Sequence, residues 1–172
     1  MARHHETERL LLRPWEAGEE EALHAIWGDP AVIFWGPSPD LAATRKLLRR
    51  IRQESDDYPD GFGWFAVRVK GEDMVSGSVF LQPYSYGDGW ELGYHVARVA
   101  QGRGYATEAS RKLIDFALAA GEGPVIALVL PDNAPSQSVV RKLELEHAGT
   151  HMHADLLHDI YEARDCSSSL RT

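Results

Sequence analysis

The sequence has little of what defines several large classes of protein. Among its 172 residues there is one cysteine, Cys166, so a disulfide framework is excluded and a reducing, cytoplasmic location is expected. No apolar run approaches the roughly 20 residues that a membrane-spanning helix needs. The polar start MARHHETER is not followed by an apolar signal segment. We therefore expect neither a membrane-bound nor a secreted protein.

Positive charge is also scarce. The chain has 18 Lys and Arg against 26 Asp and Glu, a formal net charge of −8. This balance argues against a partner with a phosphate backbone, so no nucleic acid is expected. The acidic excess would suit a cationic acceptor such as an amine, although many proteins are acidic for solubility alone. We interpret one basic run in a predicted helix as a solvated face: Arg45, Lys46, Arg49, Arg50 and Arg52.

The motifs of covalent and metal catalysis are missing too. There is no G-x-S-x-G elbow and no H-E-x-x-H motif, and the lone cysteine lies in a predicted tail. His147, His151 and His153 share one face of a predicted strand but lack a carboxylate or cysteine at ligand spacing. We interpret them as ordinary polar-face histidines and predict no metal.

What is present is the pattern of an α/β domain. Hydrophobic residues make up 44 % of the chain, enough for one core. We predict a single domain over 1–172, with its core from about 7 to 164 and a tail at 167–172. Hydrophobic periodicity predicts helices over 19–27, 38–53, 105–120 and 133–143, and strands over 10–14, 64–69, 74–81, 90–96, 124–130, 147–153 and 159–163. Ser38 is expected to cap the second helix, and Gly93 to mark a bulge.

One loop is rich in glycine. Between a predicted strand and a predicted helix the chain reads VAQGRGYATEAS. Gly102 and Gly104 let an anion approach the free N–H groups and the positive dipole at the start of a helix. A Walker loop is excluded because Gly-Lys-Ser/Thr is absent, and the loop comes too late in the chain for a dinucleotide fingerprint. A third phosphate signature, Q/R-x-x-G-x-G/A, is satisfied at every position by Gln101 to Ala106.

That hexapeptide is similar to the coenzyme A pyrophosphate loop of the GNAT acetyltransferase superfamily. ELGYHV before it and YATEASRKLIDFAL after it resemble the family's fourth strand and pyrophosphate-binding helix. Asn133 to Ser136 matches the N-x-x-S that opens the family's next helix. TERLLLRPW resembles the first strand of the RimJ/RimL branch, which acetylates protein N-termini. The chain departs from the family at Glu144, where a left-handed glycine usually ends a helix.

The resemblance covers about Thr7 to Arg164 and implies the GNAT fold. This is an α/β (α+β) fold in which about four helices flank a mixed, mostly antiparallel sheet of about seven strands. If Gly93 marks a bulge, the backbone after it splays from the next strand and pairs with the pantetheine arm. Arg98 and Arg103 bracket the loop as partners for phosphate. The implied acetyl-CoA contacts are Tyr94, His95, Val96, Gln101, Gly102, Arg103, Gly104, Tyr105, Ala106, Thr107, Asn133 and Ser136.

Two residues are candidates for catalysis. Glu91 matches the position of a catalytic glutamate in histone-type family members and is our candidate base for the amine. The alternatives are a solvent-facing strand glutamate at this position, or Asp88 or His95 as the base. Ser136, or a nearby tyrosine, is the candidate that protonates the leaving thiolate, although Ser136 also fits a first-turn capping hydroxyl.

These expectations define an acetyl-CoA-dependent N-acetyltransferase that acts by direct attack in a ternary complex. The expected acceptor is a protein N-terminal α-amine. The alternatives are a polyamine, aminoglycoside or amino acid as acceptor, or a non-catalytic acyl-CoA-binding domain. The RimJ/RimL branch often pairs, which leaves a homodimer open. Aromatic candidates for the acceptor pocket are Trp35, Trp64, Tyr84, Tyr86 and Trp90.

Overall fold

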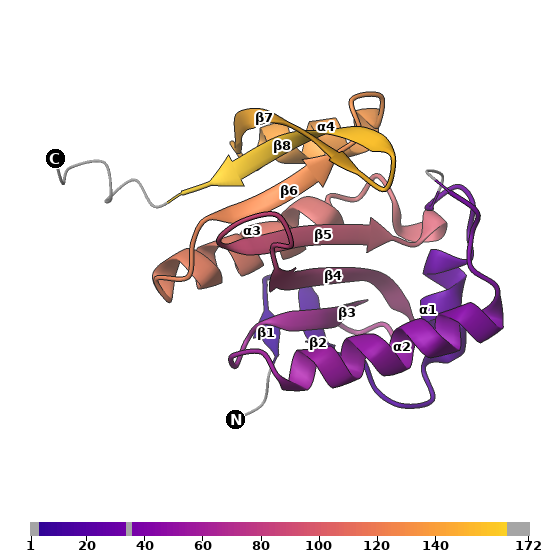
Figure 1. Cartoon of the computed structure of the whole chain (residues 1–172). Helices are drawn as coiled ribbons and strands as arrows, with labels where there is room; N and C mark the ends of the chain where they lie inside the picture. Colours follow the sequence, from indigo (N-terminus) through magenta and orange to yellow (C-terminus); the bar gives the residue numbers. More distant parts are fainter. Residues whose placement is uncertain (1–3, 34–35, 165–172) are drawn as a thin grey trace, which may run out of the picture.

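The structure, a computed structural model, describes residues 4–33 and 36–164 (Figure 1). Cys166, the predicted tail at 167–172 and Trp35 lie outside the described residues. The helices are α1 (Glu20–Trp27), α2 (Leu41–Asp56), α3 (Tyr105–Ala119) and α4 (Ala134–Lys142), with a short 3-10 turn η1 (Arg98–Ala100). The strands are β1 (His5–Glu6), β2 (Leu10–Pro14), β3 (Gly63–Val69), β4 (Val75–Pro83), β5 (Trp90–Val96), β6 (Val125–Val129), β7 (Glu146–His153) and β8 (Leu156–Ala163).

The strands form one mixed sheet in the order β1-β2-β3-β4-β5-β6-β8-β7. Every neighbouring pair is antiparallel except β5 and β6, which are parallel. The mostly antiparallel sheet with four helices confirms the predicted fold class. The sheet has eight strands where about seven were predicted. The additional strand is β1, whose two residues are too short to produce a detectable alternation.

Alternation along β3 divides the core into two layers. Phe65 and Val67 point to the face covered by α3, whereas Trp64 and Ala66 point to the face covered by α1 and α2. Figure 1 shows α2 in front of the sheet and α3 behind it. A smaller cluster of Ala127, Val129 and Val140 joins α4 to β6. The helices therefore cover both faces of the sheet. The sheet itself opens where two neighbouring strands, β5 and β6, separate.

The two parallel strands in the middle of the sheet separate soon after they begin. Trp90 pairs with Val125 and Glu91 with Ile126, and the pairing of β5 with β6 in the described chain ends there. Figure 1 shows the two arrows diverging toward their carboxyl ends. The predicted splay of β5 is thus present. Where the strands part, β5 has N–H and C=O groups that a neighbouring strand would otherwise pair with by hydrogen bonds.

The bulge predicted at Gly93 is wrong. Each residue of β5 from Trp90 to Val96 pairs with one residue of β4 in unbroken register. Gly93 is required for a different reason, because a Cβ at this position would lie 2.0 Å from Cζ of Phe80. The divergence of β5 therefore comes from its relation to β6 and not from an irregularity in β5 itself.

Two helix ends also differ from the sequence-based expectation. Asp40, and not Ser38, caps α2, because its carboxylate accepts a hydrogen bond of 2.7 Å from the N–H of Ala43. At the end of α4, Glu144 adopts the left-handed conformation itself, with φ of 58°. The N–H of Leu145 then donates to the carbonyl of Val140 at 3.1 Å. The chain thus keeps the family's helix ending without its glycine, at a cost in backbone strain.

We predict that Glu144→Gly raises the free energy of unfolding by about 0.5–1 kcal/mol, since glycine adopts positive φ without the Cβ clash. Thermal denaturation should show a rise in Tm of about 1–3 °C for a chain of this length. Glu144→Ala is the matched control, because it removes the same carboxylate but keeps the Cβ. Equal shifts in the two variants would contradict the strain at this position.

Candidate active site

The glycine-rich loop forms the start of α3. Gly102 and Gly104 both have positive φ, 77° and 81°, which explains why the chain uses glycine at these positions. Gly104 is the N-cap residue, and the first helical hydrogen bond runs from Glu108 N–H to its carbonyl at 3.0 Å. The N–H groups of residues 105–107 precede that bond and so have no carbonyl partner within the helix. Together with the helix dipole they make a site for an anion.

A cavity of about 430 Å³ opens beside this loop. Most of the predicted coenzyme contacts line it, namely Tyr94, His95, Val96, Gln101, Gly102, Gly104, Tyr105, Ala106, Thr107, Asn133 and Ser136. Ala31 and Val32, from the segment after α1, also line the cavity. The structure thus brings nearly all the predicted contacts around one space large enough for part of a nucleotide-sized ligand.

The loop is held in place by a charged network that the sequence did not reveal. Arg9 makes a salt bridge of 2.5 Å to Glu108 and donates to the carbonyl of Arg103 at 3.0 Å. Thr7 also donates to Glu108, at 2.5 Å. The pKa of Glu108 is lowered, because the hydrogen bonds from Thr7 and Arg9 outweigh the opposing effect of burial. The turn between β1 and β2 thereby fixes both the loop and the first turn of α3.

The two arginines predicted to bind phosphate have other neighbours. Arg98 forms a two-pronged hydrogen bond with Asp29, with Nε to Oδ2 at 3.1 Å and Nη2 to Oδ1 at 2.5 Å. Its guanidinium is therefore engaged in joining η1 to the segment after α1, and its predicted phosphate role is wrong. Arg103 is exposed and is absent from the lining of the cavity. Its backbone carbonyl, not its side chain, has a described contact, with Arg9.

Backbone groups of β5 face the gap at every second residue. Trp90 N–H donates toward β6, to Pro124 O at 2.9 Å, while Ala97 N–H donates toward β4, to Ser76 O at 2.9 Å. Alternation therefore directs the backbone of Tyr94 and Val96 into the gap. Gln101 Nε2 donates to the carbonyl of Val96 at 3.1 Å, which agrees with this direction.

His95 differs from its two neighbours. Alternation directs its backbone groups to β4, where it pairs with Ser78, so the predicted backbone contact of His95 in the gap is wrong. Its ring packs 4.4 Å from that of Trp27. Burial lowers the pKa of His95 to about 4, so the ring is neutral near pH 7. A base that weak is poorly suited to hold a proton taken from an amine.

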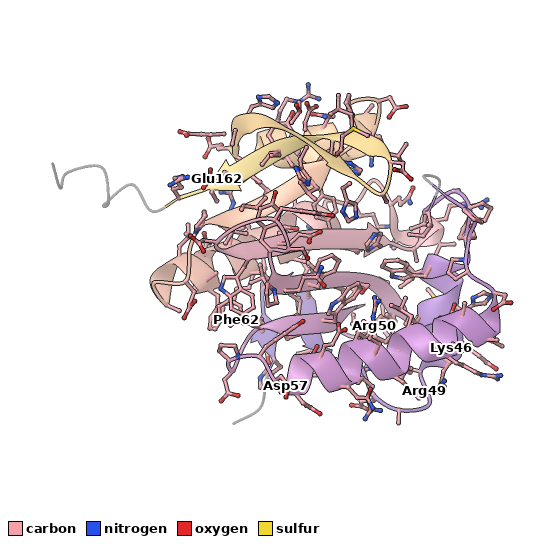
Figure 2. All side chains as sticks on the ribbon, in the orientation of Figure 1. Lys46, Arg49, Arg50, Asp57, Phe62 and Glu162 are labelled. Atoms are coloured by element: carbon pink, nitrogen blue, oxygen red, sulfur yellow. The ribbon has the colours of Figure 1, made fainter. Side chains whose placement is uncertain are left out.

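A second cavity of about 480 Å³ lies on the other side of the gap. Its walls include Trp27, Trp64, Phe80, Gln82, Ser85, Glu91, His153 and His158. Arg50 of α2 lies at the edge of this cavity, but its side chain is exposed and pairs with Glu54 at 3.7 Å, in agreement with the predicted solvated face. Figure 2 shows Arg50 on the side of α2 toward the sheet and Arg49 on the opposite side. We name this space the acceptor cavity.

Glu91 is the carboxylate of the acceptor cavity. Gln82 Nε2 donates to its Oε2 at 3.2 Å, and Trp64 Nε1 donates to Gln82 Oε1 at 3.2 Å. Burial raises the pKa of Glu91, while the Gln82 hydrogen bond and the nearby His153 and His158 act in the opposite direction. A half-buried carboxylate with a raised pKa is a better proton acceptor near neutral pH than an exposed one. The solvent-facing alternative for Glu91 is thereby excluded.

The two cavities meet at four residues: Tyr94, His95, Asn133 and Ser136 line both. Asn133 is the N-cap of α4, and its Oδ1 accepts from Ser136 N–H at 3.2 Å. The Tyr94 hydroxyl donates to the carbonyl of Ser136 at 3.3 Å. Burial raises the pKa of Tyr94 to about 12, so this hydroxyl keeps its proton at neutral pH. The junction therefore holds two hydroxyl groups, those of Ser136 and Tyr94, and the Tyr94 hydroxyl is hydrogen-bonded to the Ser136 carbonyl.

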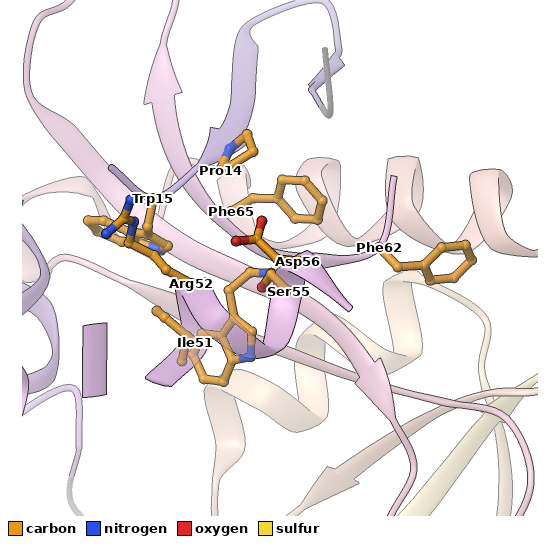
Figure 3. Close-up of a pocket in the computed structure, with 9 residues that line it drawn as sticks. Pro14, Trp15, Ile51, Arg52, Ser55, Asp56, Phe62 and Phe65 are labelled. Carbon is orange, nitrogen blue, oxygen red and sulfur yellow. The ribbon is translucent and has the colours of Figure 1, made fainter. Parts of the chain in front are cut away.

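A third cavity, of about 350 Å³, lies at the carboxyl end of α2 (Figure 3). Figure 3 shows Arg52 beside Trp15, with Asp56 between Phe65 and Ser55. Trp64 lines both this cavity and the acceptor cavity and so forms the wall between them. The other aromatic candidates within the described chain, Tyr84, Tyr86 and Trp90, are absent from the lining of the acceptor cavity.

A metal centre and a membrane-spanning helix are two other features that the described residues could have formed. Within residues 4–33 and 36–164, no group of three or more His, Cys, Asp or Glu side chains is arranged to hold a metal ion. None of the helices in this part of the chain is both long and apolar enough to cross a membrane.

Comparison with known proteins gives a consistent picture. The uncharacterized N-acetyltransferase p20 of Bacillus licheniformis is 30 % identical over 148 residues, which cover 83 % of this chain and 82 % of that protein. An acetyltransferase from Agrobacterium tumefaciens superposes with a TM-score of 0.81 at 22 % identity, covering 94 % of each chain. RimJ of Mycobacterium smegmatis, solved in complex with CoA-disulfide, superposes with a TM-score of 0.73 at 21 % identity, covering 95 % of this chain and 84 % of that one.

The family model for the acetyltransferase (GNAT) domain matches residues 9–146, most of the chain and all of the gap between β5 and β6. Acetyl-CoA is the acetyl donor that this assignment brings with it. The glycine loop, the divergent strands and the paired cavities thus have one explanation: the chain belongs to the GNAT acetyltransferase family and is an acetyl-CoA-dependent N-acetyltransferase.

Proposed function

We propose that the protein transfers the acetyl group of acetyl-CoA to the α-amine of a protein N-terminus, by direct attack in a ternary complex. The observation that carries the proposal is the junction at which the loop-side cavity meets the acceptor cavity, with Glu91 on the acceptor side. The shared fold with RimJ of M. smegmatis favours the RimJ/RimL branch. The first-strand resemblance TERLLLRPW favours the same branch.

The loop-side cavity supplies binding. The free N–H groups at the start of α3 bind the pyrophosphate oxygens, and the open space at Gly102, where a Cβ would meet nothing within 4 Å, lets them approach. Backbone groups of Tyr94 and Val96 pair with the pantetheine arm in the gap. Acetyl-CoA, when bound, supplies a thioester carbonyl and a thiolate leaving group. A backbone N–H of β5 then faces the thioester oxygen and stabilises the charge that develops on it.

Glu91 and the hydroxyl groups at the junction accept and donate the protons that move during the reaction. Glu91 accepts, directly or through water, one proton from the acceptor ammonium, and the neutral nitrogen then forms the C–N bond. When the C–S bond breaks, Ser136 or Tyr94 donates a proton to the thiolate sulfur. The same hydroxyl regains a proton from the nitrogen, which carries one proton too many after attack. The sum is an amide, a free thiol and one proton.

The strength of this base favours an α-amine as acceptor. At pH 7 the deprotonation of a lysine ammonium costs about 4.6 kcal/mol, whereas that of an α-ammonium costs about 1 kcal/mol. A single half-buried carboxylate, Glu91, is a strong enough base to deprotonate the α-ammonium.

An amine panel tests this proposal. Thiol release from acetyl-CoA should be greatest with peptides that begin with Ala or Ser, compared with lysine peptides blocked at the N-terminus, spermidine, aminoglycosides and free amino acids. Preference for a small-molecule class would overturn the protein N-terminus as acceptor. Release no faster than hydrolysis with every amine, in protein that binds acetyl-CoA, would favour a non-catalytic acyl-CoA-binding domain.

We predict that Glu91→Gln lowers kcat by about 10²-fold, since a positioned base contributes about 10²–10⁴ to the rate. The loss should be greatest above the pKa of Glu91 and below that of the acceptor, where the carboxylate is ionised and the acceptor still carries its proton, and acetyl-CoA affinity should remain nearly unchanged. Because burial raises the pKa of Glu91, the wild-type rate should fall on the acid side at a higher pH than an ordinary glutamate would produce.

Asp88→Asn is the matched control for Glu91→Gln. Asp88 is exposed in the loop before β5 and also loses one carboxylate in the exchange. It should keep the wild-type kcat and pH profile. A pH–rate profile that moves in the Asp88 variant and not in the Glu91 variant would exchange the roles of the two residues.

A second variant tests the loop. Gly104→Val should weaken acetyl-CoA binding at least about tenfold, because a β-branched residue cannot hold the positive φ that aims the N–H groups of α3. Isothermal calorimetry measures the affinity. Gly71→Val is the control, since Gly71 also has positive φ, 86°, with open space around it, but lies in the β3–β4 turn. Unchanged affinity in a folded Gly104 variant would disprove the loop's role.

A further inference from the structure

The β7–β8 hairpin brings two histidines to the acceptor cavity. His153 and His158 line it together with Glu91, and their ring centroids are 5.5 Å apart. His158 is only 8 % exposed. The hairpin is joined to the site through β8, which pairs with β6, the strand that borders the gap.

The proton on the His158 ring is fixed by the backbone. Nδ1 lies 2.9 Å from the carbonyl oxygen of Leu156. A carbonyl only accepts hydrogen bonds, so Nδ1 carries the hydrogen when the imidazole is neutral. The lone pair is then on Nε2, for which the described chain provides no hydrogen-bonding partner. A ring fixed at one nitrogen with a lone pair at the other is suited to accept a proton.

His153 extends the arrangement to the surface. Its Nδ1 lies 2.7 Å from the hydroxyl of Tyr86 in the β4–β5 loop. Tyr86 is 47 % exposed, so its hydroxyl lies where protons exchange with water. The acceptor cavity, which Glu91, His158 and His153 line together, is thus joined through His153 and Tyr86 to the exposed surface.

Charged and titratable groups from several elements lie around these two imidazoles. They are Arg50 of α2, Tyr84 of the β4–β5 loop, Glu91, Tyr94 and His95 of β5, His151 of β7 and Asp159 of β8. Asp159 is engaged by His147 at 3.2 Å and by Gln137 at 3.1 Å. Burial, with a further contribution from the Glu91 carboxylate, raises the pKa of Tyr84. Glu91 is therefore the carboxylate that lines the acceptor cavity together with the two imidazoles.

We propose that His158 accepts at Nε2, through Glu91, the proton that the acceptor amine loses before it attacks, and that His153 passes this proton toward solvent beside Tyr86. An N–H bond of the ammonium breaks, an O–H bond at Glu91 forms and breaks in turn, and an N–H bond forms at Nε2. The proton then moves through water to His153 and is released, and no electrons are transferred. The inference rests on the proposed function of the site.

The test compares His158→Gln with a matched control on the same hairpin. His158→Gln should lower kcat about tenfold or more with the KM for acetyl-CoA unchanged. Its pH–rate profile should differ from that of the wild type, because the imidazole that receives the proton from Glu91 is lost. His147→Gln should match the wild type, since His147 is half exposed, pairs with Asp159 and is absent from the cavity lining.

A cavity-forming variant separates proton transfer from a structural role. His158→Ala should be slow, and added imidazole should restore at least part of its kcat in proportion to the concentration of imidazole base. The wild type and His147→Gln should not respond. A structural defect would not be repaired by a small base, so a slow His158→Ala enzyme that does not respond to imidazole would overturn the proposal.

The remaining outcomes distinguish this inference from the proposed function. If the wild type transfers acetyl to an amine and His158→Gln keeps its kcat and pH profile, the relay is wrong and the proposed function stands. If the wild type transfers acetyl to no amine in the panel, the proposed function fails, and the relay fails with it.

Discussion

The separation of β5 from β6 after Glu91 is the feature on which the rest of the site depends. Two parallel strands that pair at Trp90 and Glu91 and then part leave a slot through the middle of the sheet. The slot has backbone groups of β5 on one edge, the N-terminus of α3 at one end and a half-buried carboxylate beside it. A ligand that is long, narrow and anionic at one end satisfies all of these at once. Acetyl-CoA has that shape.

The rest of the fold holds the two sides of the slot at a fixed separation. The α3 side is fixed by the Arg9–Glu108 salt bridge, which joins the first turn of the helix to the β1–β2 turn. The α4 side is fixed by the Asn133 cap and the left-handed ending at Glu144. Tyr94 links the two sides through its hydrogen bond to Ser136. Under the proposed transfer by direct attack, the two sides need only position the reactants and move protons, without a covalent intermediate.

Much of this was predictable from the sequence, and the exceptions have physical reasons. The helices and most strands were predicted because their hydrophobic patterns extend over enough residues to be recognised. The anion-binding loop was predicted because its glycines lie at the start of a helix. The role of Gly93 was misjudged because a bulge and a close ring contact both favour glycine, and only the position of Phe80 decides between them. Arg98 was misassigned because its partner Asp29 is 69 residues away in sequence. The positions of His153 and His158 in the acceptor cavity were not predicted either. Alternation along a strand predicts which residues share a face of the sheet, but it does not predict which cavity that face borders.

The most direct test of the slot is residue-resolved amide hydrogen exchange with and without acetyl-CoA. The account predicts slower exchange at Tyr94 and Val96 of β5 and at residues 105–107 at the start of α3. Exchange at His95 and in β3 should be unchanged, because those amides already pair within the sheet. Protection elsewhere on the protein, with Tyr94, Val96 and the start of α3 unaffected, would contradict the central claim that the gap between β5 and β6 holds the acetyl donor.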